Sequence, residues 1–249
     1  MYRIVFLDID GTILNSNEQL EERLIENIIK LQQKGILVAL ASGRSLVASK
    51  IYGEKFRCSI YVTYNGSFVI SNNEVLYDVK IPSQLAFNLC SKTKEYNGAY
   101  FHFSYKTSRS NRPQPDIEHL LPQATQSKLI DTNRDAHRLA LYLDSTKDRE
   151  SLKAEITDEY VFDEGNRLEV YPVGSKWSGI IPILNRLGIS ASEVVAIGNG
   201  INDIEMLEAA GLGIAMGNSP DYVKKCANLI TEDNDHDGVA LALEEIFNL

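Results

Sequence analysis

The sequence has little cysteine and lacks a long apolar run. Its three cysteines, Cys58, Cys90 and Cys226, are far apart and form no C-x-x-C pair. This spacing excludes a disulfide framework and a cysteine-based zinc site, and it favours a reducing compartment. The first apolar run begins at Ile4 and stops at Asp8, so no signal peptide is expected, and no segment is long enough to span a bilayer. We therefore expect a cytoplasmic protein with no membrane partner.

Basic residues are also scarce relative to acidic ones. The 249 residues include 25 Lys and Arg against 34 Asp and Glu, which gives a formal net charge of -9. Nucleic acids and anionic membranes bind basic surfaces, so this charge balance disfavours both partners. The chain is long enough to bury a sizeable core in one large domain or two modest ones.

Polar clusters follow three apolar segments in the outer parts of the chain. They are Asp8 to Thr12 after Ile4 to Leu7, Ser42 to Arg44 after Ile36 to Ala41, and Gly198 to Asp203 after Val194 to Ile197. Continuous apolar runs of this length are typical of parallel strands covered on both faces. Because the carboxyl ends of such strands lie at one edge of a doubly wound sheet, the three clusters are expected to share a site.

The middle of the chain has a different pattern, which begins at about Ser83. Helical and strand-like segments follow in the order αββαββ, which is typical of a compact layer of helices on one sheet. A polar segment from Lys106 to Pro115 is interpreted as a loop, with Arg109 and Arg112 in solvent. We predict an α/β fold, with a doubly wound parallel sheet from residues 1–82 and 175–249 and a second domain inserted at 83–174.

Asp8 and Asp10 indicate a cation site. Strand side chains alternate, so both carboxylates are expected on the same side of the chain where the first strand ends. Two carboxylates so close together need a cation or a shared proton, and Mg²⁺ prefers oxygen ligands. Asp203, with Asn202 beside it at a helix start, can also hold the metal and orient a phosphate. The four histidines show no metal-ligand spacing.

These residue types suit the hydrolysis of a phosphomonoester. Asp8 can attack phosphorus to form an aspartyl-phosphate, and Asp10 can protonate the leaving group and later take a proton from water. Ser42 offers a hydroxyl and nearby backbone N–H groups to the phosphate, and Lys176 supplies a positive charge. Alone, Ser42 would more simply be part of a turn and Lys176 a solvated lysine, so the hypothesis depends on their convergence.

The motifs resemble those of a known family. D-x-D-G-T at 8–12, Ser42, Lys176 and G-N-G-I-N-D at 198–203 are similar to the four motifs of the haloacid dehalogenase superfamily. The Asn65-Gly66 turn, the insertion and Asp237-Gly238-Val239 resemble its Cof-type phosphatase branch, class IIB. The resemblance implies a Rossmann-like core, a mobile cap domain of the αββαββ type, and Mg²⁺-dependent hydrolysis of small phosphorylated metabolites such as sugar phosphates.

The resemblance also implies roles for individual residues. Asp8 would be the nucleophile and a metal ligand, and Asp10 the acid/base that also gives the metal its backbone carbonyl. The residues that would bind the phosphate are Thr12, Ser42, Gly43, Lys176 and Asn202. Asn199 and Asp203 would complete the metal site. In the family an aspartate usually stands where this chain has Asn199, so metal affinity is expected to fall, although Asp203 can compensate.

Three alternatives remain open at this point. The neutral Asn199 is compatible with a phospho-ligand-binding or regulatory protein that has lost turnover. Phosphoryl transfer to a sugar, as in mutases, uses the same residue types. A dinucleotide dehydrogenase is the weakest hypothesis, because no G-x-G-x-x-G follows the first strand. The chain is expected to act as a monomer or a homodimer.

Overall fold

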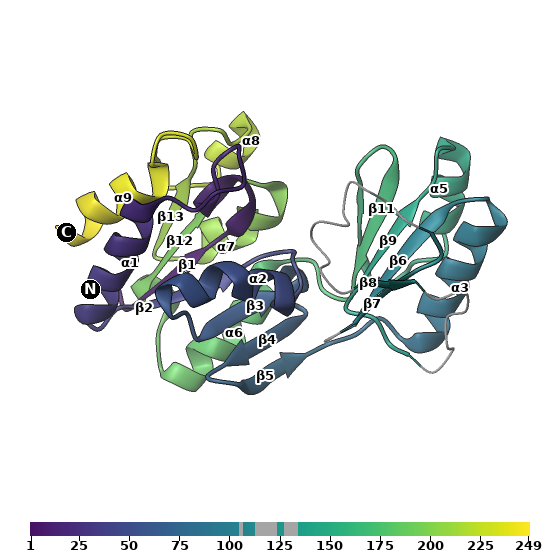
Figure 1. The fold of residues 1–249 in the computed structure, drawn as a ribbon, viewed down its shortest axis with the longest axis horizontal. Coiled ribbons are helices and arrows are strands. Elements are labelled where there is room, and N and C mark those ends of the chain that lie inside the picture. Colours follow the sequence, from purple (N-terminus) through teal and green to yellow (C-terminus); the bar gives the residue numbers. More distant parts are fainter. Residues whose placement is uncertain (105–106, 113–123, 127–133) are drawn as a thin grey trace. The chain divides into compact units, whose positions relative to one another are not determined.

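The computed structural model describes residues 1–104, 107–112, 124–126 and 134–249. Its internal contacts divide the chain into two compact units, both drawn in Figure 1. The first unit contains Met1–Gly43, Ser49–Tyr77 and Ser175–Leu249, and the second contains Arg44–Ala48 and Asp78–Gly174. In the described part of the chain, no helix has both the length and the apolar character needed to cross a membrane.

The first unit is built on an eight-stranded sheet in the order β14-β13-β12-β1-β2-β3-β4-β5. In chain order the strands are β1 (Ile4–Leu7), β2 (Leu37–Ala41), β3 (Ile60–Thr63), β4 (Phe68–Ser71), β5 (Glu74–Asp78), β12 (Val194–Gly198), β13 (Leu212–Ala215) and β14 (Leu229–Ile230). The strands from β14 to β3 are parallel, and β4 runs antiparallel to β3. The chain winds from β1 outward in one direction and from β12 outward in the other, which confirms the predicted α/β fold class.

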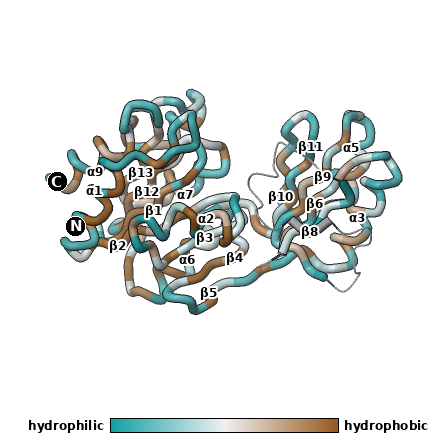
Figure 2. The backbone as a smooth tube through the Cα atoms, in the orientation of Figure 1, coloured by the Kyte–Doolittle hydropathy of each residue, from teal (hydrophilic) through white to brown (hydrophobic). Residues whose placement is uncertain are grey.

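Helices cover this sheet. The helices of this unit are α1 (Glu22–Gln33), α6 (Lys176–Leu187), α7 (Ile204–Ala209), α8 (Asp221–Lys224) and α9 (Gly238–Phe247), and of α2 (Leu46–Gly53) the part from Ser49 onward belongs to it. Helix α1 contacts α9 and β2, whereas α6 contacts α7 and β3. All four residues of β1 are 0% exposed, as expected for a strand with neighbours on both faces. Figure 2 shows the hydrophobic residues gathered along the strands of this unit and the hydrophilic ones in its loops.

The second unit contains a six-stranded sheet in the order β10-β11-β9-β6-β7-β8. Its elements in chain order are α3 (Ser83–Glu95), β6 (Ala99–Phe103), β7 (Ser108–Ser110), β8 (Ala124–Gln126), β9 (Arg138–Tyr142), α5 (Thr146–Lys153), β10 (Tyr160–Asp163) and β11 (Arg167–Tyr171). Helices α3 and α5 contact each other, and α3 packs on β6 and β9. The predicted order αββαββ is present, with β7 and β8 added at one edge of the sheet.

One sequence-based interpretation in this unit is wrong. The segment from Lys106 to Pro115 was expected to be a loop, but Ser108–Ser110 forms β7 and pairs antiparallel with β6. Arg109 therefore lies in a strand and is half-buried, whereas Arg112 follows the strand and is exposed, as predicted, with its Nη2 donating to the Asn97 carbonyl at 2.8 Å. A three-residue strand of polar residues has no apolar alternation to reveal it, and its partner strand determines its conformation. Residues 106 and 113–115 of that segment lie outside the described residues.

Candidate active site

The carboxyl ends of β12, β1 and β2 lie side by side. Strand β1 pairs in parallel with both neighbours, and its last residue, Leu7, is in register with Ile197 of β12 and Leu40 of β2. The chain leaves these strands toward Asp8, Asn199 and Ser42. The three polar clusters of the sequence are therefore at one edge of the sheet, where loops of open α/β sheets commonly form binding sites.

The turn after β1 buries Asp8 and exposes Asp10. Asp8 is 5% exposed, and its backbone N–H donates to the Ile197 carbonyl at 3.0 Å. Gly11 has a φ of +68°, and a Cβ atom there would lie 2.5 Å from Asn199 Nδ2. Glycine is thus favoured over other residues at this position of the D-x-D-G-T motif for two reasons: the backbone is left-handed, and the loop after β12 approaches too closely for a side chain.

A buried ammonium group joins two aspartates. Lys176, the first residue of α6, is 0% exposed, and its Nζ donates to Asp8 Oδ1 at 2.5 Å and to Asp203 Oδ1. Burial alone would lower the pKa of Lys176, but the charges of Asp203 and Asp8 hold that pKa above its ordinary value. Burial also raises the pKa of Asp8, and the charge of Asp203 adds to this effect while Lys176 opposes it. Lys176 therefore stays charged at neutral pH.

The carboxylate of Asp203 shapes the loop after β12. Its Oδ2 accepts hydrogen bonds from the backbone N–H groups of Asn199 at 2.9 Å and Gly200 at 2.8 Å, while Oδ1 accepts from Lys176. Asp203 is 0% exposed, so these three donors satisfy a carboxylate that would otherwise be costly to bury. The structure thus places Asp203 against Lys176 and the loop backbone rather than beside Asp10.

The side chains of Asp8 and Asn199 and the backbone carbonyl of Asp10 meet in the site. The Asn199 side-chain atom that points into the site lies 2.8 Å from the backbone carbonyl oxygen of Asp10 and 3.2 Å from Asp8 Oδ2. Thr12 Oγ1 can donate to Asp8 Oδ2 at 3.3 Å or to Asn199 Oδ1 at 3.1 Å. A carboxylate, a backbone carbonyl and an amide oxygen are ligand types that Mg²⁺ accepts, so these groups fit that ion.

The donor set is mixed rather than rich in charge. Among the residues that the structure describes, no group of three or more His, Cys, Asp or Glu side chains could hold a metal.

Asn65, which the sequence motifs do not assign to the site, connects two loops of the site. Asn65 follows β3 with a φ of +52°, and its backbone N–H donates to the Ser42 carbonyl at 3.1 Å. Its side-chain Oδ1 accepts from Asn202 Nδ2 at 2.9 Å. Asn65 thus fixes Asn202 relative to Ser42 and the adjacent Gly43. An Asn-Gly pair at a strand end signals a turn, but nothing local indicates the bond to Asn202.

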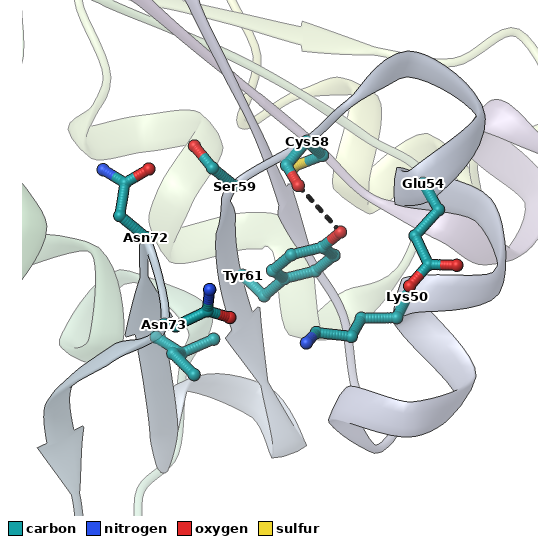
Figure 3. A pocket seen from close by; sticks show the side chains of 8 residues that line it. Lys50, Glu54, Cys58, Ser59, Tyr61, Asn72 and Asn73 are labelled. Carbon is teal, nitrogen blue, oxygen red and sulfur yellow. Dashed lines mark hydrogen bonds between the residues drawn. The ribbon is translucent and has the colours of Figure 1, made fainter.

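A separate cavity lies at the opposite edge of the same sheet, near the amino end of β3. It has a volume of about 180 Å³ and is lined by Lys50, Glu54, Cys58, Ser59, Tyr61, Ile70, Asn72 and Asn73. Figure 3 shows the Tyr61 hydroxyl donating to the Cys58 carbonyl, a bond of 2.9 Å. Burial raises the pKa of the Cys58 thiol to about 11, so this thiol stays protonated and is a poor nucleophile. The cavity is not part of the candidate site.

Comparison with known proteins supports the resemblance. A 5-amino-6-(5-phospho-D-ribitylamino)uracil phosphatase of Bacillus subtilis is 28% identical over 270 residues, which cover 99% of this chain and 98% of the relative. The solved structure of a haloacid dehalogenase-like hydrolase from Bacteroides thetaiotaomicron has a TM-score of 0.90 and 27% identity, with 99% of this chain and 100% of that chain covered.

Two further comparisons concern the fold and the family. A sugar phosphatase of subclass IIB of the same superfamily shares the fold, with a TM-score of 0.85 and 22% identity over 99% of this chain and all of that one. The sequence profile of the haloacid dehalogenase-like hydrolases matches residues 5–243. The chain therefore belongs to the haloacid dehalogenase-like hydrolase family, as the motifs predicted.

Proposed function

We propose that this protein is a Mg²⁺-dependent phosphatase that hydrolyses small phosphorylated metabolites of the sugar-phosphate class. The observation that carries the proposal is the buried Lys176 ammonium held 2.5 Å from Asp8 Oδ1, beside the Asp10 carbonyl and the Asn199 side-chain amide. A carboxylate that faces both a fixed cation and a cation-binding group of oxygens is suited to attack an anionic phosphate. The phosphatase among the relatives supports the same reaction.

In this proposal Asp8 is the nucleophile. Its Oδ2 lies beside the Asn199 amide, where the metal would bind, and we assign the attack to Oδ1, the oxygen that accepts from Lys176. Oδ1 forms a bond to phosphorus as the ester P–O bond breaks, and the Asp10 carboxylic acid gives its proton to the departing alcohol. Asp10 then takes a proton from a water molecule that attacks phosphorus, which releases phosphate and restores Asp8. Asp10 is exposed, so its side chain is accessible to water.

The remaining residues bind charge. When bound, Mg²⁺ would be held by Asp8, the Asp10 carbonyl and Asn199, and it would neutralise the phosphate oxygens. We assign phosphate binding to Thr12, Ser42, Gly43, Lys176 and Asn202. The motifs predict Asp203 as a metal ligand, but its contacts support a positioning role, because they fix Lys176 and the backbone of the loop after β12.

The proposal includes the surroundings of the reaction. We assign residues 83–174 as the cap domain and expect a cytoplasmic monomer or homodimer. The free state of Cys58, Cys90 and Cys226 supports a reducing compartment.

A panel of phosphate esters tests the reaction. Purified protein with Mg²⁺ should release phosphate from at least one sugar phosphate, from p-nitrophenyl phosphate, or from the substrate of the Bacillus subtilis relative. Asp8→Asn should reduce turnover at least about 1,000-fold while the protein remains folded, because it removes the nucleophile. If wild-type protein is inactive on the whole panel with Mg²⁺ present, or if Asp8→Asn keeps its turnover, the proposal is wrong.

A second candidate function is the binding of a phosphorylated ligand without turnover. The neutral Asn199 side chain favours it, because a weaker metal site would slow the chemistry more than it weakens phosphate binding. Calorimetry would distinguish the two functions. Tight binding of a phosphorylated metabolite, without phosphate release and with release restored by Asn199→Asp, would support the binding protein.

A further inference from the structure

The Asn199 amide can occupy its position in two orientations. An amide has an oxygen and a nitrogen of nearly the same shape, so a half-turn about its last side-chain bond exchanges them. With the nitrogen pointing into the site, it lies 2.8 Å from the Asp10 carbonyl oxygen, 3.2 Å from Asp8 Oδ2 and 3.1 Å from Thr12 Oγ1, and its two hydrogens can donate to two of these three acceptors. With the oxygen pointing in, only the Thr12 hydroxyl of these three neighbours has a hydrogen to donate.

The protein by itself favours the nitrogen-inward orientation. With the oxygen inward, the amide oxygen would lie 2.8 Å from the Asp10 carbonyl oxygen and 3.2 Å from Asp8 Oδ2. All three atoms are acceptors, so they repel one another unless a positive group lies among them. The amide nitrogen supplies that group in the absence of a cation. A metal ion must therefore displace an existing set of hydrogen bonds and turn the amide before it can bind.

The charges near the site also limit metal binding. The oxygen cluster is formed by the side chains of Asp8 and Asn199 and the backbone carbonyl of Asp10. The buried charges next to it are the carboxylates of Asp8 and Asp203 and the ammonium of Lys176, which sum to one net negative charge, and the exposed Asp10 carboxylate adds a second negative charge on the solvent side. One buried negative charge does not balance the two positive charges of a divalent ion at a buried site, and the Lys176 ammonium repels that ion. Phosphate carries the missing negative charge, and Mg²⁺ commonly binds through one or two carboxylates together with phosphate oxygens.

We propose that Mg²⁺ and phosphate bind to this protein as a coupled pair, with the Asn199 amide turning its oxygen inward only when both are present. The inference rests on the proposed function for the identity of the ion and the anion. By thermodynamic linkage, each ligand raises the affinity for the other by the same factor. Asn199 acts here as a positioning residue for the metal, and its neutrality makes the metal site depend on the anion.

Titration of the full-length protein tests this coupling without any substrate turnover. Mg²⁺ affinity is measured by calorimetry and by the shift in melting temperature, first alone and then with saturating inorganic phosphate. For wild-type protein we expect phosphate to tighten Mg²⁺ binding at least about fivefold. Asn199→Asp adds the missing charge and removes the donating nitrogen, so Mg²⁺ alone should bind more tightly than to wild type and the enhancement by phosphate should shrink.

Asn234→Asp is the matched control. Its Nδ2 also donates to a backbone carbonyl, that of Leu14 at 2.9 Å, so the substitution makes the same change of charge outside the oxygen cluster. It should keep the wild-type coupling. Equal Mg²⁺ affinity with and without phosphate in wild-type protein would overturn the inference, even if the protein hydrolyses phosphate esters. If neither ligand shifts the melting temperature and no ester is hydrolysed, the proposed function fails together with it.

Discussion

Replacing Lys176 with methionine tests whether its ammonium group is what allows the carboxylates of Asp8 and Asp203 to be buried together. Lys176 and Asp203 are 0% exposed and Asp8 is 5% exposed, and the ammonium donates to both carboxylates. Methionine keeps much of the volume but brings no charge, so the substitution leaves two buried carboxylates without a counter-charge. Removing one partner of a buried ion pair lowers the free energy of unfolding by about 3–5 kcal/mol. For a chain of this size the melting temperature should fall by roughly 6–20 °C.

The assay is urea and thermal unfolding of both proteins at pH 7 in a buffer with EDTA. A double variant, Lys176→Met with Asp203→Asn, separates charge from packing. Asparagine keeps an oxygen that can accept from the N–H groups of Asn199 and Gly200 while removing one unpaired charge. The double variant should regain at least about 1 kcal/mol relative to Lys176→Met. A loss below about 1 kcal/mol in the single variant, or a further loss in the double variant, would refute the reasoning.

Three other predictions follow from the packing and the titrating groups. Gly179→Ala places a Cβ within 2.7 Å of a carbonyl in the turn after β3, so unfolding experiments should show a loss of about 1–3 kcal/mol. Gly188→Ala, whose Cβ meets nothing within 4 Å, serves as control and should lose less, from its φ of +60° alone. Asn65→Gly allows the same backbone conformation but removes the hydrogen bond to Asn202. In steady-state kinetics the KM for a phosphate ester should therefore rise about two- to tenfold. An unchanged KM would contradict the role of this hydrogen bond in positioning Asn202. Burial lowers the pKa of His137, although the carboxylate of Asp78 opposes this effect. As the pH falls, the unfolded chain therefore binds a proton at this histidine before the folded protein does, and the free energy of unfolding should fall below about pH 6.5. In His137→Gln the free energy of unfolding should depend less steeply on pH.

Much of the core fold was predictable from apolar runs. A strand buried on both faces, such as Ile4–Leu7, must be continuously apolar, and the polar residues that follow it mark where it ends. The same signal located the ends of β2 and β12, and parallel topology then brought their loops to one edge. Strand β7 was missed because Ser108–Ser110 has no apolar alternation and depends on pairing with β6.

The details of the site were less accessible. Motif spacing selected Lys176, but not its complete burial between Asp8 and Asp203, because burial depends on packing between segments 168 residues apart. The bond between Asn65 and Asn202 spans 137 residues and has no local pattern. The orientation of the Asn199 amide is set by three neighbours on the turn after β1, which only the folded arrangement brings together.

The central place of β1 in its sheet affects how the protein can fold as it is synthesised. Its hydrogen-bonding partner on one side, β2, follows within a few dozen residues, but β12 on the other side begins only at Val194. A ribosome-bound chain that ends before Val194 therefore exposes one edge of its innermost strand, and such edges can pair with other chains. Until α6 has emerged, Asp8 also lacks the ammonium that compensates its charge. We expect this contact between distant segments to make assembly of the sheet late and slow, and to make nascent fragments prone to aggregation.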